Sequence, residues 1–220
     1  MTKSKDEVSK RWARFLYRLT VVVHGRRSEN AAMPEVVSFS RMDDGTPDDY
    51  ALLTRLEDAF NADLPDRILH AVERLRHTLT GFKVNRYEHS LQSATRALRD
   101  GRDEEYVVAA LVHDIGDELA PYSHGAMTAA AMRPFISERL CWIVEHHPVF
   151  QMFHYGAASG DDPNARERYR GHQWFDDCAE FCDKYDQNCF DPDYDSLPIE
   201  TFAPMVRSTF SHPRYLDAVR

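Results

Sequence analysis

The stretch YVVAALVHDIGD, residues 106–117, decides the fold. Its first seven residues are almost wholly apolar, which predicts a central helix that is buried on all sides. Such a helix would carry His113 and Asp114 into the core, where a charged group without a partner is costly. A metal ion would satisfy the imidazole and the carboxylate together. We therefore predict that this stretch supplies the first half of a metal site.

Helices are also predicted on both sides of the central one. The segment 86–99 carries His89 with apolar residues on neighbouring turns, and Gly101 suits its C-terminal end. Further helix starts are predicted at Thr46-Pro47, Pro65, Ser123 and Pro134, and helices over about 174–188 and 198–210. The helix that starts at Pro134 is expected to end at His147, before Pro148. No segment shows useful strand-like alternation, so the chain is predicted to be all-α.

Composition bounds the class of protein. The length of 220 residues supports a full hydrophobic core, and the formal net charge of −9 argues against a nucleic-acid surface. The four cysteines show no paired zinc spacing and the chain shows no secretory signal, which favours reduced thiols in the cytoplasm. No apolar run reaches the roughly 18 residues of a membrane span.

The first 40 residues differ from the rest. They are predicted to be a basic N-terminal extension and linker, followed by a single domain over 41–220. Apolar residues between Trp12 and Val23 recur at helical spacing, which favours a basic amphipathic helix. Partner docking, weak membrane contact and no role at all stay open for it. The segment before Met33 is as readily explained as an extension upstream of the true translation start as it is by a functional arm.

Six residues form an ordered set of metal-binding types. They are His89, His113, Asp114, His124, His147 and Asp186. This order resembles the HD-domain superfamily of metal proteins. The nearest likeness within it is to the mixed-valence diiron oxygenases, the group that contains inositol oxygenase and the bacterial hydroxy-phosphonate oxygenases. The likeness covers about Arg86 to Pro192. It is carried by the segments 88–92, 111–116, 144–147 and 184–186 and by the position of His113, 24 residues after His89.

The resemblance implies an HD-domain helical bundle around a dinuclear metal site. It makes the four histidines imidazole ligands, Asp114 the carboxylate that bridges both metals, and Asp186 a terminal ligand. The implied cofactors are two iron ions, Fe(II)/Fe(III), with manganese or another divalent metal as the alternative; imidazole and carboxylate suit these metals. His146 is the alternative to His147 as the fourth imidazole ligand, and the family pattern Val-Glu-x-His favours His147. Asp183 is the alternative to Asp186 as the terminal carboxylate ligand, and the aromatic-aspartate pair Tyr185-Asp186 favours Asp186.

The chain also departs from the phosphonate oxygenases. Leu79 and Phe82 fall where a tyrosine and a glutamate cover the empty iron position in that group. Three substrate-holding basic positions of the resemblance are occupied here by Asp117, Gln151 and Asp183. Carboxylates repel a phosphonate through the Coulomb term by which lysines hold it. We therefore expect Asp117 and Asp183 to form an acidic wall of the active site, facing a neutral polyol or a hydroxylated amine.

Three functions follow from this pattern. The first is an oxygenase in which one iron binds substrate hydroxyl oxygens and the other activates O₂, leading to cleavage of a C–C or C–heteroatom bond. The second is an HD-type phosphohydrolase, in which two metals clamp a phosphate and generate hydroxide. The third is a metal-stabilised module without activity. The oxygenase is the preferred hypothesis, with a small-molecule substrate and O₂ as its only predicted partners.

Overall fold

The computed structural model describes residues 35–216. The amphipathic helix predicted near the N-terminus lies outside these residues. The chain divides into two units, residues 1–55 and 56–220, and helix α2 (Pro47–Ala62) runs across the division. The domain boundary expected near residue 40 stays a prediction.

In the first unit, a short 3₁₀ turn, η1 (Met42–Asp44), precedes the start of α2. This helix begins at Pro47, as the Thr46-Pro47 pair predicts. The Asp49 carboxylate accepts hydrogen bonds from the backbone N–H of Thr46 at 3.0 Å and from its hydroxyl at 2.6 Å. It also accepts one from the backbone N–H of Ser38 at 2.7 Å. Asp49 thus fastens the entering chain to the first turn of the helix.

The second unit is built from helices. Their bounds are α3 (Leu64–Arg74), α4 (Arg86–Arg99), α5 (Glu104–Val112), α6 (His124–Met132), α7 (Glu138–Ser159), α8 (Phe175–Tyr185) and α9 (Ile199–Phe210), with 3₁₀ turns η2 (Leu75–His77) and η3 (Ala165–Tyr169). Residues 35–216 contain no strand. The prediction of an all-α fold is confirmed.

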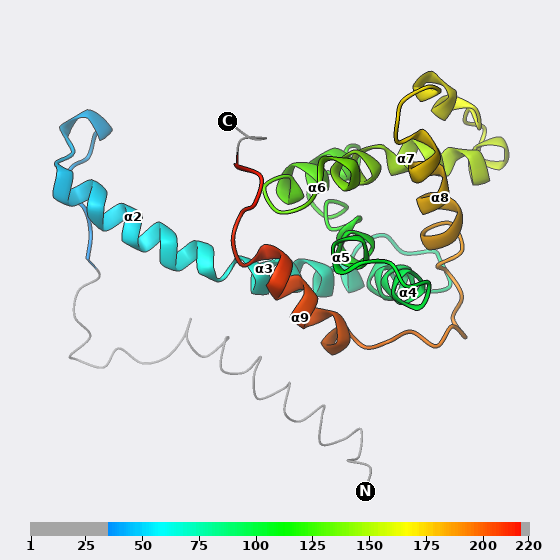
Figure 1. The fold of residues 1–220 in the computed structure, drawn as a ribbon, viewed down its shortest axis with the longest axis horizontal. Helices are drawn as coiled ribbons and strands as arrows, with labels where there is room; N and C mark the ends of the chain where they lie inside the picture. Colours follow the sequence, from blue (N-terminus) through cyan, green and yellow to red (C-terminus); the bar gives the residue numbers. More distant parts are fainter. Residues whose placement is uncertain (1–34, 217–220) are drawn as a thin grey trace, which may run out of the picture. The chain divides into compact units, whose positions relative to one another are not determined.

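Helix α5 is the centre of this unit. Residues 107–112 are each at most 1% exposed, as the apolar run predicts. In Figure 1, α4 and α5 lie together, with α6 and α7 on one side and α9 on the other. Each fully buried valine or leucine side chain of α5 contributes about 1.5–3 kcal/mol to folding. This burial fixes the end of α5, and with it His113, in the interior.

Helix α7 does not end before Pro148, contrary to the sequence prediction. It continues to Ser159, with Pro148 inside it. A proline in a helix removes one backbone N–H, here the one that would bond to the carbonyl of Val144. The imidazole Nδ1 of His147 donates to that carbonyl instead, at 2.7 Å. This replacement satisfies the freed oxygen and offsets part of the cost of the proline.

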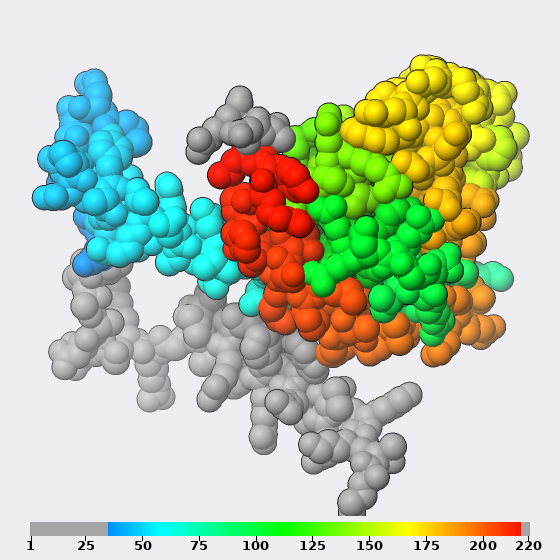
Figure 2. All heavy atoms as spheres, viewed as in Figure 1, coloured from blue at the N-terminus to red at the C-terminus, as the bar shows by residue number. Residues whose placement is uncertain are grey.

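The end of the described chain is bonded to the segment that follows α6. The backbone N–H groups of Arg214 and Tyr215 donate to the carbonyl of Pro134, at 2.8 and 2.9 Å. In the space-filling view, this red segment lies against the green part of the chain that contains α6 (Figure 2). Among the residues with described positions, no helix is both long and apolar enough to cross a membrane.

Candidate metal centre

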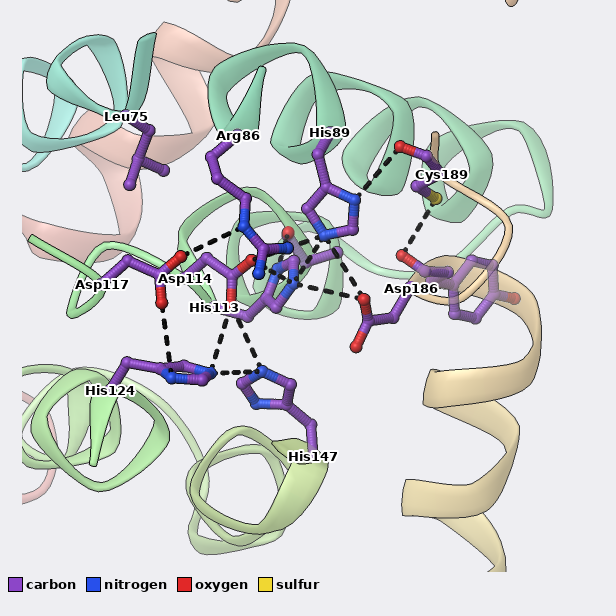
Figure 3. A network of polar contacts seen from close by, with 12 residues as sticks. Leu75, Arg86, His89, His113, Asp114, Asp117, His124, His147, Asp186 and Cys189 are labelled. Carbon is purple, nitrogen blue, oxygen red and sulfur yellow. Dashed lines mark hydrogen bonds and ion pairs between the residues drawn. The ribbon is translucent and has the colours of Figure 1, made fainter. Parts of the chain in front are cut away.

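The six predicted ligands converge on one point of the second unit (Figure 3). His89 comes from α4, His113 and Asp114 from the end of α5, and His124 from the start of α6. His147 comes from the middle of α7, and Asp186 directly follows α8. Five of the six residues are at most 2% exposed, and only the side chain of His124 is partly open, at 17%. Segments almost 100 residues apart are thereby brought together.

Asp114 lies between two groups of side chains. Its Oδ2 is 3.5 Å from His89 Nε2 and 3.4 Å from His113 Nε2. Its Oδ1 is 3.5 Å from His124 Nε2 and 3.3 Å from His147 Nε2. We call His89, His113 and Asp186 the inner cluster, and His124 and His147 with Asp114 Oδ1 the outer cluster. The two oxygens of one carboxylate therefore face the two clusters, as a bridging ligand requires.

Backbone carbonyls orient three of the imidazoles. The Nδ1 atom of His89 lies 3.1 Å from the carbonyl oxygen of Cys189. That of His113 lies 2.8 Å from the carbonyl oxygen of Ala110, and that of His147 lies 2.7 Å from the carbonyl oxygen of Val144. A carbonyl oxygen only accepts, so Nδ1 carries the proton in each ring and Nε2 carries a lone pair. The Ala110 carbonyl is available because it lies in the last turn of α5. The Val144 carbonyl is available because of Pro148.

The resulting arrangement fits a cation in each cluster. The Nε2 atoms of His89 and His113 are 3.2 Å apart, and so are those of His124 and His147. Two lone pairs at this distance repel, whereas a metal ion between them would bind both. The Oδ2 atoms of Asp114 and Asp186 are buried and accept no hydrogen bond, although the Arg86 guanidinium lies 3.3 Å from that of Asp114. A bound metal ion would offset the cost of burying these oxygens. The inner cluster is itself a three-residue group able to hold a metal, and two further such groups share Asp114, one with His113 and His147 and the other with Asp117 and His124.

The protonation states of His113 and Asp114 support the same fit. Burial lowers the pKa of His113 to about 4, despite the opposing charges of Asp114 and Asp186. For Asp114, burial acts to raise the pKa, but His113 and the Arg86 guanidinium outweigh it and hold the pKa well below its usual range. Neutral imidazole and ionised carboxylate are the forms that bind metal.

Two glycines allow α6 to bring His124 into the site. A Cβ atom at Gly116 would lie 2.5 Å from the carbonyl oxygen of His124. A Cβ atom at Gly125 would lie 2.7 Å from the carbonyl oxygen of Val144, on α7. Only glycine permits both approaches, which place His124 beside Asp114 and His147. Gly116 in the His-Asp-Ile-Gly stretch was therefore a usable sequence signal for the close approach.

The sequence predicts that Asp117 forms part of an acidic wall of the active site. In the structure Asp117 does not line the cavity beside the clusters. Its Oδ2 is 3.2 Å from Arg86 Nε, and its Oδ1 is 3.3 Å from His124 Nδ1. Burial and the charge of Asp114 raise the pKa of Asp117 to about 6. A carboxylate that faces the far nitrogen of a metal-binding imidazole typically orients that ring. Asp117 therefore lies behind His124 and pairs with Arg86.

Arg86 is the functional candidate that sequence reasoning missed. Its Nη1 lies 3.3 Å from Asp114 Oδ2, and its side chain is 16% exposed. The available signal was its position three residues before His89, which puts both side chains on one face of α4. Its charge compensates the acid at Asp117.

Asp183 and His146 lie away from the six residues. Asp183 is exposed and lines a separate surface depression, with Arg96 and Lys184. The expectation that it contributes to the wall is wrong because Asp186 ends α8 with non-helical backbone angles, so their spacing does not place them on one face. His146 stacks on Trp142, with ring centroids 4.3 Å apart. That His147 rather than His146 binds metal stays a prediction.

A cavity of about 620 Å³ opens onto the outer cluster and Asp186. This volume is in the range of small-molecule sites. Its lining residues are Leu79, Phe82, Arg86, Asp114, His124, His147, Pro148, Gln151, His154, Tyr155, Asp186, Gln187 and Phe190. His89 and His113 are not among them. The cavity thus meets one side of the ligand set, behind which the inner histidines are buried.

Comparison with known proteins identifies part of the chain. The model of the HD domain family matches residues 86–169. This span includes five of the six clustered residues and ends before Asp186. A comparison with curated proteins found no match. The family match supports the HD-domain superfamily, whose domains bind divalent metals and are generally enzymatic, and the buried histidines and aspartates agree with it.

Proposed function

Since residues 86–169 match the HD domain family, we propose that the chain is an HD-domain oxygenase with two iron ions. It would use O₂ to cleave a C–C or C–heteroatom bond of a small hydroxylated substrate. One observation carries this proposal: each cluster offers two imidazoles and one carboxylate. Two histidines and one carboxylate with open positions are typical of non-haem iron oxygenases.

The residues around the clusters suit this chemistry. Bound iron would supply the coordination of a substrate hydroxyl and the activation of O₂. His124, His147, Asp114 and Asp186 face the cavity, so the substrate would approach from there. Phe82 and Phe190 stack at 4.7 Å between ring centroids and border the cavity with apolar surface. Apolar walls limit the access of water to a reactive site.

The charge of the cavity favours a substrate without a phosphate. Arg86 is the only lysine or arginine among the described residues that line it. The guanidinium is already paired with Asp114 and Asp117, and Gln151 stands where the resemblance expects a lysine. A phosphate or phosphonate would therefore meet no unpaired cationic side chain. A neutral or cationic hydroxylated molecule avoids this deficit.

A metal-dependent phosphohydrolase is the second candidate, and Arg86 is the observation that favours it. The guanidinium lines the cavity beside Asp114. Two divalent metals and an arginine can together stabilise charge on a phosphoryl group. Manganese rather than iron would be the expected metal for this activity.

Metal reconstitution distinguishes the two functions. The metal-free protein would be loaded with Fe(II) without oxygen, partly oxidised, and measured by electron paramagnetic resonance. We expect a coupled Fe(II)/Fe(III) signal in the parent and its loss in His124→Ala, which lacks one outer ligand. The manganese form would be assayed with p-nitrophenyl phosphate. No coupled iron signal, together with phosphatase turnover that His124→Ala abolishes, would overturn the oxygenase proposal.

A further inference from the structure

Two polar side chains of α7 border the cavity without a role in the clusters. Gln151 and His154 both line it, and Gln151 Oε1 and His154 Nε2 are buried without a hydrogen-bond partner. A buried polar atom without a partner is rare because it loses its bonds to water. The two residues are three apart on one helix, so their side chains share a face. Because both residues line the cavity, rotation of each side chain would let a ligand there supply the missing partners.

We propose that Gln151 and His154 form a second polar subsite, which binds the hydrogen-bond-donating end of the substrate, a hydroxyl or an ammonium group. The inference rests on the proposed function only in taking the other end of the substrate to lie at the metal clusters. It replaces the acidic wall expected from Asp117 and Asp183, since one of these carboxylates is paired behind His124 and the other lies elsewhere.

The chemistry of the two atoms selects a donor. The Gln151 oxygen only accepts hydrogen bonds, so an anionic carboxylate or phosphonate end would be repelled by it. Burial lowers the pKa of His154, although Asp183 opposes the shift, so the imidazole is neutral at neutral pH. A neutral imidazole can accept from a hydroxyl or an ammonium group through its unprotonated nitrogen. With Nε2 as the unprotonated nitrogen of His154, a hydroxyl or ammonium end suits both residues.

The position along α7 sets the length of the ligand. Gln151 follows His147 by four residues, and His154 follows it by seven. At about 1.5 Å per residue, they lie about 6 and about 10 Å further along the helix axis. A substrate with one hydroxyl at the clusters must extend over several bonds to reach them. The subsite thus favours a molecule with polar groups at both ends over a simple alcohol.

The test measures binding rather than turnover. The protein would be loaded with Co(II), whose visible absorption changes when a ligand enters the metal shell, and titrated with four-carbon ligands. These are the terminal diol, the amino alcohol, the hydroxy acid and the simple alcohol. We expect the diol, the amino alcohol or both to bind about ten-fold more tightly than the simple alcohol, as one or two added hydrogen bonds imply. Preference for the diol identifies a hydroxyl end, and preference for the amino alcohol an ammonium end.

Variants assign the effect to the two side chains. Gln151→Ala and His154→Ala should each weaken binding of the preferred ligand about five- to ten-fold, with the simple alcohol unchanged. Met152 lies between them on α7 but does not line the cavity. The control variant Met152→Ala should therefore bind each ligand like the parent. His154→Gln, which keeps an acceptor, should recover part of the loss. Circular dichroism and cobalt content would confirm that each variant is folded and loaded.

Two results would overturn the subsite. One is that the parent binds the simple alcohol, or the hydroxy acid, as tightly as it binds the diol or the amino alcohol. The other is unchanged affinity in both alanine variants. Because Co(II) binding needs neither O₂ nor electron transfer, a missing iron signal would overturn the oxygenase alone. A failed titration would leave that signal intact.

Discussion

The inner and outer clusters differ in what holds their histidines. His89 and His113 are fully buried, and backbone carbonyls fix their Nδ1 atoms. His124 is partly open, lines the cavity, and has the Asp117 carboxylate 3.3 Å from its Nδ1. A metal position enclosed by the fold is typical of stable binding, whereas a position open to a cavity can exchange ligands. The difference predicts that the inner histidines would hold a metal more tightly and that a substrate would approach the outer cluster.

His147 connects the two kinds of support. Like the inner histidines, it is buried and donates to a backbone carbonyl, but it belongs to the outer cluster and lines the cavity. Asp114 connects the clusters themselves. The comparison therefore predicts a gradient of effects, from the shared carboxylate, through the buried inner ligands, to the supports of the outer cluster.

The largest effect is expected for Asp114→Ala. Because both clusters use this carboxylate, the variant should fall from two bound metals per chain to none by elemental analysis. The parent should show a metal-dependent rise in Tm, and the variant none. Asp114→Asn, which keeps the shape and one good ligand oxygen, serves as the control and should retain at most one metal. Two metals per chain in the alanine variant would show that the carboxylate is not shared.

The next effect separates the clusters by stability. His113→Ala should destabilise the metal-free protein by about 2–4 kcal/mol, because it leaves a buried cavity and removes the partner of the Ala110 carbonyl. His124→Ala removes a partly open side chain and should cost less than about 1 kcal/mol. Urea unfolding after treatment with a chelator would measure both. Equal losses would contradict the assignment of different supports to the two clusters.

A smaller effect is expected behind the outer cluster. Asp117→Ala should weaken metal binding there by about 10–100-fold, the usual cost of losing an outer partner of a ligand. The inner metal should be retained, so competition with a chelator would show one weakened site and one unchanged site. Asp117→Asn keeps an oxygen toward His124 and should be affected less. Equal weakening of both sites would mean that Asp117 acts through Asp114 or Arg86 rather than through His124.

The smallest effect is expected for His146, the neighbour of the ligand His147 on α7. His146→Ala should leave the metal content unchanged, because His146 stacks on Trp142 outside both clusters. His147→Ala should lose the outer metal. Metal analysis of the two variants, prepared in parallel, is sufficient. Loss of metal in His146→Ala alone would move the ligand by one residue, or about 100° around the helix.

Local sequence patterns determined the helices and the order of the six candidate ligands. The apolar run of α5 predicts burial by its composition alone, and the caps and prolines mark most helix starts. Asp103 and Asn85 occupy the N-cap positions of α5 and α4, as side chains that accept backbone N–H bonds. These features could be predicted because they depend on neighbours within one or two turns. Residue type and order also supported the HD superfamily, which the family match now supports independently.

Only the tertiary structure decided what the side chains around the clusters do. Pro148 lies inside a helix, and His147 donates to the Val144 carbonyl that the proline leaves without its backbone partner. Asp117 pairs with Arg86, which lies 31 residues earlier on another helix, and therefore does not line the cavity. Spacing along the chain gives the face of a helix but not the partner that another helix presents to it. Burial and charge pairing between distant segments select that partner, and they exist only once the helices have packed.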